Sequence, residues 1–315
     1  MADGIEISVV TPAYNEGAGL EAFQARISSV MAQLSLAYEI LYVNDGSSDD
    51  TLAVMRKLAA GDAHVSIVNL SRNFGKEIAM TAGLDHARGD AVVVIDADLQ
   101  DPPELIPQLV AKWREGFDMV YARRVRRDGE TALKKTTAAA FYRLIHRVGP
   151  VELPKDTGDF RLMSRRVVDA VRSLREQHRF MKGLFAWVGY PTAEVTYARD
   201  PRHAGATHMN YWNLWNLAVE GITSFTLFPL KMATYLGLIV AATSFAYGGY
   251  EIVTTLINGI DVPGYASLLT VVLFLGGLQL LALGVIGEYL GRIFNESKNR
   301  PLYWVADYEP GKKPT

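Results

Sequence analysis

Two long apolar stretches near the end of the chain, residues 232–257 and 266–287, limit what this sequence can fold into more than any other feature. Each is longer than the roughly 20 residues that a helix needs to cross a lipid bilayer. Within 232–287 the charged residues are Glu251 and Asp261 alone. We therefore predict two transmembrane helices within residues 229–291. A helical hairpin buried inside a soluble protein is the alternative.

The charges that flank the two stretches predict their orientation. Positive residues lie before the first stretch at Lys231 and after the second at Arg292, Lys298, Arg300, Lys312 and Lys313, whereas residues 258–264 between them contain no Lys or Arg. Cytoplasmic segments carry the excess of Lys and Arg. We therefore expect the protein in the cell inner (plasma) membrane, with both termini and a tail of residues 292–315 in the cytoplasm. Aromatic residues within 209–228 predict an amphipathic helix at the membrane interface, with an ordinary core helix as the alternative.

The first 208 residues show the pattern of an α/β domain. Apolar runs of strand length at 5–10, 39–43, 65–70, 91–95 and 119–121 alternate with helical patterns at 18–34, 49–59, 76–87 and 103–113. This alternation predicts a mostly parallel sheet with helices on both faces. Ligands bind such sheets at the carboxyl ends of the strands. Polar clusters follow three of the predicted strands, at 11–16, 44–49 and 96–104.

The third of these clusters is the strongest chemical signal in the chain. Asp96 and Asp98 follow a buried strand directly, and on an extended backbone they share a face. Two carboxylates so placed can share a hard cation such as Mg²⁺ or Mn²⁺, which commonly also binds phosphate. We therefore expect a nucleotide diphosphate held through a metal. The alternative is an acidic turn in which Asp101 caps a helix that starts at Pro102.

Composition and missing motifs exclude several other classes of protein. The net charge of −2 gives no support for nucleic-acid binding, and the absence of cysteine excludes disulfides and thiolate metal sites. No glycine-rich dinucleotide or P-loop motif follows the first strand, and no zinc-protease or serine-hydrolase motif occurs. Two basic stretches, 122–135 and 197–208, are either solvated loops or a site for an anionic substrate.

Three segments resemble the GT-A (Rossmann-like) glycosyltransferases of family 2: VVTPAYNE at 9–16, NDGSSDDT at 44–51 and DADLQDPPE at 96–104. Later segments, TGDFRLM at 157–163, RFMKG at 179–183 and the arginine pattern at 197–205, narrow the resemblance to polyprenyl-phosphate glycosyltransferases. That group includes the dolichol-phosphate mannose synthases and the bacterial bactoprenol glucosyltransferases. The two C-terminal apolar stretches are similar to those of the bacterial branch.

The resemblance implies a role for individual residues. The nucleotide sugar would be bound by Pro12, Tyr14, Glu16, Asp45 and Asp96, and the metal by Asp98 and Gln100. The acceptor phosphate would be bound by Arg123, Arg127, Arg199, Arg202, Thr207 and His208. Asp98, Asp159, Arg123 and Arg127 are the residues implied in catalysis. His208 departs from the family pattern, which has a lysine there, and histidine is only partly charged at neutral pH.

The expected activity is inverting transfer of one sugar from a nucleotide diphosphate sugar to a polyprenyl phosphate. UDP-glucose and undecaprenyl phosphate are the first choices, and aminoarabinose, galactose, mannose and GlcNAc donors stay open. A processive polysaccharide synthase and a non-catalytic membrane protein that binds nucleotide sugars or lipid phosphate are the alternatives. Small residues in the second apolar stretch predict close helix packing, and with the resemblance they favour a homo-oligomer such as a tetramer.

Overall fold

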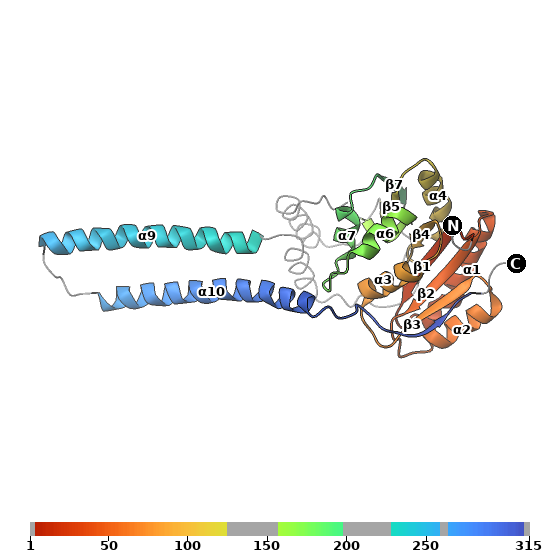
Figure 1. Cartoon of the computed structure of the whole chain (residues 1–315), viewed down its shortest axis with the longest axis horizontal. Coiled ribbons are helices and arrows are strands. Elements are labelled where there is room, and N and C mark those ends of the chain that lie inside the picture. Colours follow the sequence, from red (N-terminus) through yellow and green to blue (C-terminus); the bar gives the residue numbers. More distant parts are fainter. Residues whose placement is uncertain (1–3, 125–156, 198–227, 259–263, 312–315) are drawn as a thin grey trace. The chain divides into compact units, whose positions relative to one another are not determined.

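The computed structural model describes residues 4–124, 157–197, 228–258 and 264–311. The chain divides into two compact units, one that contains all the strands and one that contains the two long C-terminal helices (Figure 1). Five residues expected at the acceptor phosphate lie outside the described residues: Arg127, Arg199, Arg202, Thr207 and His208. Residues 209–227 and 259–263 lie outside them as well.

The strands of the first unit form one sheet in the order β7-β5-β6-β4-β1-β2-β3-β8. β1 pairs in parallel with β2 and β4, β2 with β3, and β5 with β7, while the other neighbours are antiparallel. The expected mostly parallel sheet is confirmed. The bounds are β1 Ile7–Ala13, β2 Tyr38–Asn44, β3 Val65–Leu70, β4 Ala91–Val94, β5 Met119–Arg124, β6 Thr157–Ser164, β7 Thr192–Tyr197 and β8 Val305–Glu309.

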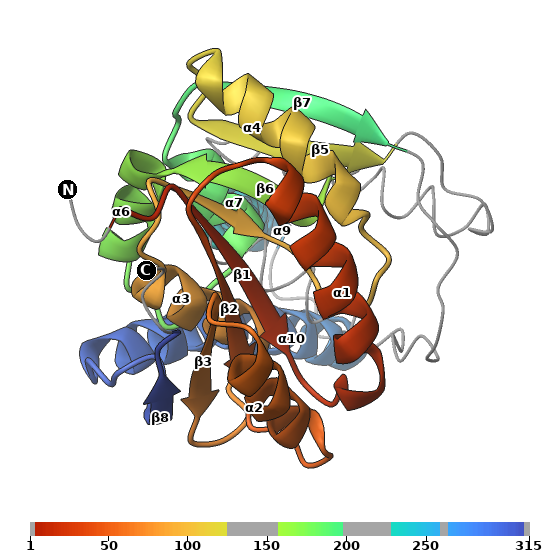
Figure 2. The ribbon, with the colours of Figure 1, turned by 90° about the vertical axis from the view of Figure 1, so that its right-hand side faces the viewer.

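Helices cover both faces of this sheet (Figure 2). One layer contains α1 (Gly17–Gln33), α2 (Thr51–Gly61) and α4 (Ile106–Arg114), which follows the short 3₁₀ helix η1 (Pro103–Leu105). The other contains α3 (Lys76–His86), α6 (Arg165–Ser173) and α7 (Met181–Trp187). Strands covered on both faces read as continuous apolar runs, which is why these strands were visible in the sequence.

The alternation of side chains along β1 shows how the two layers are held. Ile7 and Val9 are fully buried in the core formed with α1 and α2. Val10 points to the opposite face, where it meets α3 at Gly83. A Cβ at Gly83 would overlap Val10, so the glycine allows α3 to lie directly against the sheet. This contact places the first turn of α3 over the carboxyl ends of the strands.

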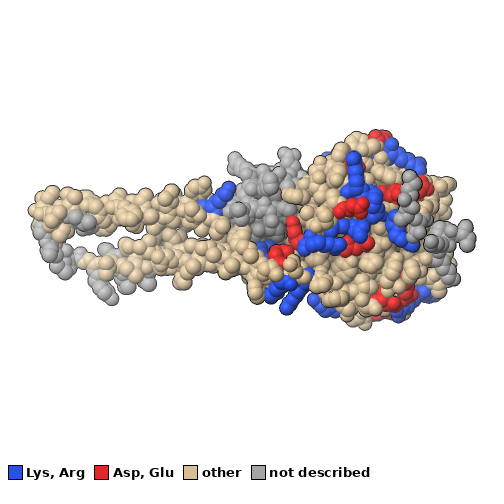
Figure 3. All heavy atoms as spheres, in the orientation of Figure 1, with Lys and Arg blue, Asp and Glu red and all other residues tan. Residues whose placement is uncertain are grey.

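The second unit contains α9 (Phe228–Asn258) and α10 (Tyr265–Ser297). Two segments are long and apolar enough to cross a membrane: Leu230–Asn258 and Phe274–Ser297. Each has a mean hydropathy of 1.4, and its most apolar part is not buried inside the protein. Their apolar side chains are exposed, and Figure 3 shows almost no charge along the two helices, whereas both signs are mixed over the first unit. The alternative of a hairpin buried in a soluble core does not fit this exposure.

The C-terminal segment differs from the expected tail. α10 continues to Ser297, and residues 305–309 form β8, which extends the sheet antiparallel to β3. Arg56 of α2 donates hydrogen bonds to Asp307 and Glu309 at 2.9 and 2.7 Å. The segment is short and polar, so no apolar pattern marked it. Only the open edge of β3 provides the backbone partners that make it a strand.

Candidate active site

A pocket of about 270 Å³ lies at the carboxyl ends of the central strands. The residues that line it come from the end of β1 and from the segments after β1, β2, β3 and β4: Pro12, Ala13, Tyr14, Glu16, Asp45, Asn73, Gly75, Lys76, Ala79, Asp96, Ala97 and Asp98. All five residues expected to bind the nucleotide sugar, Pro12, Tyr14, Glu16, Asp45 and Asp96, are among them, as is Asp98. The expectation that three separate loops meet at one edge of the sheet agrees with this pocket.

Asp45 organises the entry into α3. Its side chain is buried, and its two carboxylate oxygens accept hydrogen bonds from the backbone N–H groups of Phe74 and Gly75, at 2.7 and 3.0 Å. Burial raises the pKa of Asp45, and these two bonds oppose that effect. Gly46 has a φ of +64° and no space for a Cβ against the backbone of Arg72 and Asn73. A glycine is therefore required for the loops after β2 and β3 to approach each other.

Lys76, at the first position of α3, joins the pocket to β6. Its Nζ donates hydrogen bonds to Asp96 Oδ2 at 2.7 Å and to Asp159 Oδ2 at 2.6 Å. Burial alone would raise the pKa of Asp159. The positive charges of Lys76 and Lys182 together have the larger effect and lower this pKa to about 2. Asp159 is therefore ionised at neutral pH. Its other oxygen, Oδ1, is buried and has no hydrogen-bond partner among the described residues.

Further charged groups surround Asp159. Arg161 donates to the carbonyl oxygen of Gly158 at 2.9 Å and lies over the Phe185 ring. Lys182 of α7 donates to the carbonyl oxygen of Thr157 at 3.3 Å. On α3, burial and the Asp159 charge raise the pKa of Glu77 to about 7. Charges of both signs are therefore concentrated where α3, β6 and α7 meet.

The acidic segment after β4 turns sharply. Leu99 has a φ of +58°, and Asp98 Oδ1 accepts a hydrogen bond from the backbone N–H of Gln100 at 3.1 Å. Gln100 is buried and is not among the residues that line the pocket. Asp101 accepts a hydrogen bond from the Tyr197 hydroxyl. The helical turn that follows, η1, begins at Pro103, one residue later than the capping alternative expects.

The donor set of the pocket fits a hard divalent cation. Asp98 contributes a carboxylate to the pocket wall, and one oxygen of Asp96 is already bound to Lys76. Within the described part of the chain, no group of three acidic, histidine or cysteine residues could hold a metal alone. Mg²⁺ and Mn²⁺ suit oxygen ligands, and Mg²⁺ is usually held by one or two carboxylates together with substrate phosphates. The pocket therefore suits a cation that arrives with a diphosphate.

Arg123 was expected at the acceptor phosphate, and the structure does not bring it into the pocket. Its guanidinium, at the end of β5, donates to both carboxylate oxygens of Glu194 on β7, each at 2.9 Å. The two side chains are similarly exposed, at 45% and 41%. An exposed pair of this kind is held weakly, so a stronger anionic partner could displace Glu194.

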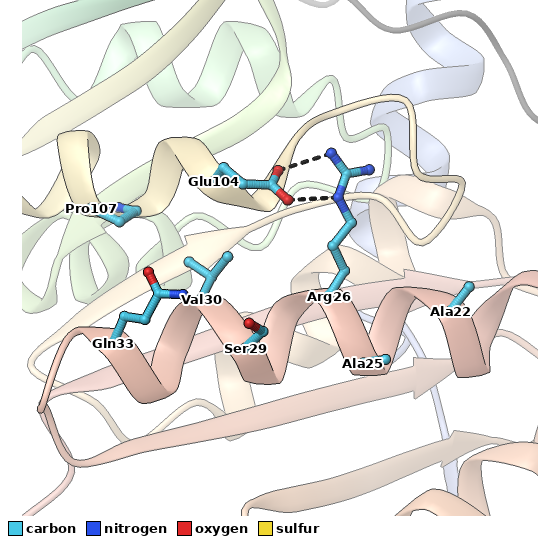
Figure 4. A pocket seen from close by; sticks show the side chains of 8 residues that line it. All are labelled: Ala22, Ala25, Arg26, Ser29, Val30, Gln33, Glu104 and Pro107. Carbon is cyan, nitrogen blue, oxygen red and sulfur yellow. Dashed lines mark hydrogen bonds and ion pairs between the residues drawn. The ribbon is translucent and has the colours of Figure 1, made fainter.

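A second hollow of about 590 Å³ lies between α1 and the segment of η1 and α4 (Figure 4). Small side chains such as Ala22, Ala25 and Ser29 line it. Its charged residues, Arg26 and Glu104, neutralise each other through hydrogen bonds of 2.7 and 2.9 Å. None of the residues expected in a site lies here, and the hollow offers no chemistry comparable to the first pocket.

Sequence reasoning missed Lys76, Glu77, Arg161 and Lys182. The polar segment 71–76 follows the third strand just as the other clusters follow theirs, so the same argument would have included Lys76. Arg161 and Lys182 lie in the segments TGDFRLM and RFMKG that carry the resemblance, but the resemblance gave them no role. They reach the site only because β6 inserts next to β4 in the sheet, a pairing of segments far apart in the sequence.

Comparison with known proteins decides the family. The glycosyl transferase family 2 profile matches residues 8–172. The chain belongs to this family. In addition, the profile of the GtrB C-terminal hairpin matches residues 228–293 of this family 2 glycosyltransferase, which supports membrane association of α9 and α10.

Curated relatives match nearly the full length of this glycosyltransferase. An uncharacterized glycosyltransferase of Synechocystis sp. is 56% identical over 96% of this chain and 95% of its own length. The bactoprenol glucosyl transferase of Shigella phage SfV is 49% identical over 96% and 99%. Among solved structures, glucosyl-3-phosphoglycerate synthase from Mycobacterium tuberculosis in complex with Mn²⁺, UDP and phosphoglyceric acid is 25% identical over 70% of this chain and 77% of that chain, with a TM-score of 0.47.

Glu77 generates a prediction about pH and stability. Its pKa of about 7 in the folded protein exceeds its ordinary value of 4.5. Between these values the folded state binds more protons than the unfolded state, so the free energy of unfolding falls as the pH rises. We expect Glu77→Gln to remove this fall. Thermal unfolding between about pH 5 and 8 should therefore show wild type losing stability relative to Glu77→Gln as the pH rises.

The matched control is Glu21→Gln, because Glu21 is an exposed carboxylate that pairs with Lys57 at the surface. This variant should follow wild type across the whole pH range. Parallel stability curves for wild type and Glu77→Gln would show that Glu77 does not titrate in this range.

Proposed function

We propose that this family 2 glycosyltransferase transfers glucose from UDP-glucose to a polyprenyl phosphate, with undecaprenyl phosphate as the first choice. The observation that carries the proposal is the pocket itself, where Asp45 from the end of β2 meets Asp96 and Asp98 from the end of β4. Identity of 49% to a bactoprenol glucosyl transferase over 96% of the chain supports the choice of sugar and acceptor. The two apolar helices suit a lipid acceptor.

In this proposal the nucleotide lies along the segments after β1 and β2. Pro12, Tyr14 and Glu16 shape one wall, and Tyr14 is 48% exposed, which leaves its ring accessible to a ligand. Asp45 keeps lone pairs beyond the two that accept backbone hydrogen bonds. These oxygens can accept hydrogen bonds from the base or ribose. Asp96 borders the side of the pocket proposed for the ribose and diphosphate.

Asp98 is the carboxylate proposed to hold Mg²⁺ or Mn²⁺, with Gln100 as the second expected ligand. A bound divalent cation would stabilise the negative charge that develops on the departing diphosphate. Gln100 is buried, and in the described structure it contacts Asp98 through its backbone. Because Gln100 does not line the pocket, its amide would have to turn toward the pocket to reach the cation.

The proposed chemistry needs no strong general base. A phosphate oxygen of the acceptor is already an anion, and direct attack on the anomeric carbon would invert its configuration. Asp159, with a pKa of about 2, is a weak base and holds no proton to donate at neutral pH. The work of the protein is then to position two anionic substrates in line. Acceptor phosphate binding is proposed for Arg123, Arg127, Arg199, Arg202, Thr207 and His208.

Asp98→Asn tests the metal proposal, because it removes a charge with little change of size. We expect transfer of radiolabelled sugar from UDP-glucose to polyprenyl phosphate to fall by at least about 100-fold, the scale of losing one charge-stabilising contact in a transition state. Thermal unfolding should stay unchanged. Asp169→Asn is the control, since Asp169 is an exposed residue of α6. Near wild-type turnover of Asp98→Asn, or of wild type in EDTA, would refute the metal proposal.

A panel of other nucleotide sugars in the same assay tests the identity of the donor.

We also propose that both helices span the inner membrane with the two termini in the cytoplasm. The charge asymmetry around the hairpin supports this orientation. A reporter fused after Thr315 should show cytoplasmic activity, and one inserted within residues 258–264 should show periplasmic activity. The opposite pair of signals would reverse the proposed topology.

A homo-oligomer such as a tetramer is proposed from the packing of α10. For Gly276, Gly277, Gly284, Gly287 and Gly291, the position of an added Cβ has no heavy atom of a neighbouring element within 4 Å among the described residues. These glycines therefore do not pack closely against α9, and their surface is available to another helix. Light scattering of detergent-solubilised protein should give the mass of more than one chain. A fully active monomer would contradict the proposal.

A further inference from the structure

The contact between Lys76 and two carboxylates spans the boundary of the pocket. Lys76 and Asp96 line the pocket, whereas Asp159 comes from β6 outside the pocket wall. Both hydrogen bonds of the ammonium are short, at 2.7 and 2.6 Å. Among the described residues, Lys76 is the one cation that bonds to both side chains.

The neighbouring cations cannot take its place in the observed arrangement. Lys182 donates a hydrogen bond to the backbone carbonyl of Thr157, and the Arg161 guanidinium donates to those of Gly158 and Asp159. Without Lys76, the carboxylates of Asp96 and Asp159 would be left near each other with no direct cationic partner. Like charges at this range repel strongly where water is partly excluded.

Both proposed substrates are anions, so this repulsion would act on them as well. We propose that Lys76 is a positioning residue that joins the donor pocket to Asp159 and cancels enough carboxylate charge for the donor diphosphate to bind. This inference rests on the function proposed above. An ammonium has three N–H donors, and the described residues take two of them. The Lys76 side chain is 46% exposed, so it remains accessible from the pocket.

Binding of UDP to the full-length protein in detergent and Mg²⁺ tests the proposal by calorimetry. We expect Lys76→Met to weaken UDP binding by roughly tenfold, the scale of a hydrogen bond to a charged group. Lys76→Arg retains the charge and should bind within about threefold of wild type. The double variant Lys76→Met with Asp159→Asn removes one of the uncompensated carboxylates. It should bind UDP more tightly than Lys76→Met alone.

Lys112→Met is the matched control, since Lys112 pairs with Glu115 on the surface of α4. It should bind UDP as wild type does. Asp159→Asn alone keeps the cation and removes an anion, so it should bind UDP at least as tightly as wild type. This variant keeps the test decisive even if Lys76→Met does not fold.

Unchanged UDP affinity in Lys76→Met, weak binding by Lys76→Arg, no recovery in the double variant, or weakened binding by Asp159→Asn would each overturn the role of Lys76. Failure of wild type to bind UDP would instead contradict the proposed function itself. The two failures are therefore distinguishable.

Discussion

Parallel pairing of β4, β1 and β2 is the constraint on which the site depends. β1 pairs in register with both neighbours, Ile7 lying opposite Tyr38 on one side and Ala91 on the other. Three chain segments therefore end at the same edge of the sheet. Because each strand is buried on both faces, a shift in register would move apolar side chains to the wrong layer. The fold thus fixes the positions of Asp45, Asp96 and the pocket between them.

Charge balance is the second organising feature. The edge of the sheet gathers several carboxylates, which suits a cation and a diphosphate but is costly without compensation. Lys76 compensates two of them from the start of α3, and Asp45 secures the loop that precedes it. The close contact of Gly83 with β1 holds the helix in place. Packing on one face of the sheet and electrostatics at its edge are therefore coupled through α3.

The chain returns to its first unit after the membrane-type hairpin. β8 adds to the edge of β3, and Tyr303 donates a hydrogen bond to Asp85 of α3 at 2.8 Å. Asp85 also accepts hydrogen bonds from Arg172 and Arg175. The C-terminal segment is therefore a structural part of the catalytic unit. In this respect, the division of the chain into consecutive domains, which the sequence favoured, is incomplete.

Much of this protein was determined by patterns that are local in the sequence. The apolar runs predicted the strands from β1 to β5 and the two long helices, because burial on both faces and lipid exposure each leave continuous apolar residues. The polar clusters that follow β1, β2 and β4 predicted where the pocket lies, and the resemblance implied roles for six of the residues that line it. Their shared location follows from a general property of parallel sheets and needed no knowledge of distant contacts.

Tertiary structure alone decided the rest. β6, α7 and β8 contact elements that are far away in the sequence. The local hydrophobic pattern therefore could not predict that Asp159 contacts Lys76, or that residues 305–309 form a strand. The same holds for Arg123, whose ion pair with Glu194 depends on the pairing of β5 with β7. Hydrophobic periodicity specifies which face of an element is buried, but pairs of charges are specified only once the elements have packed.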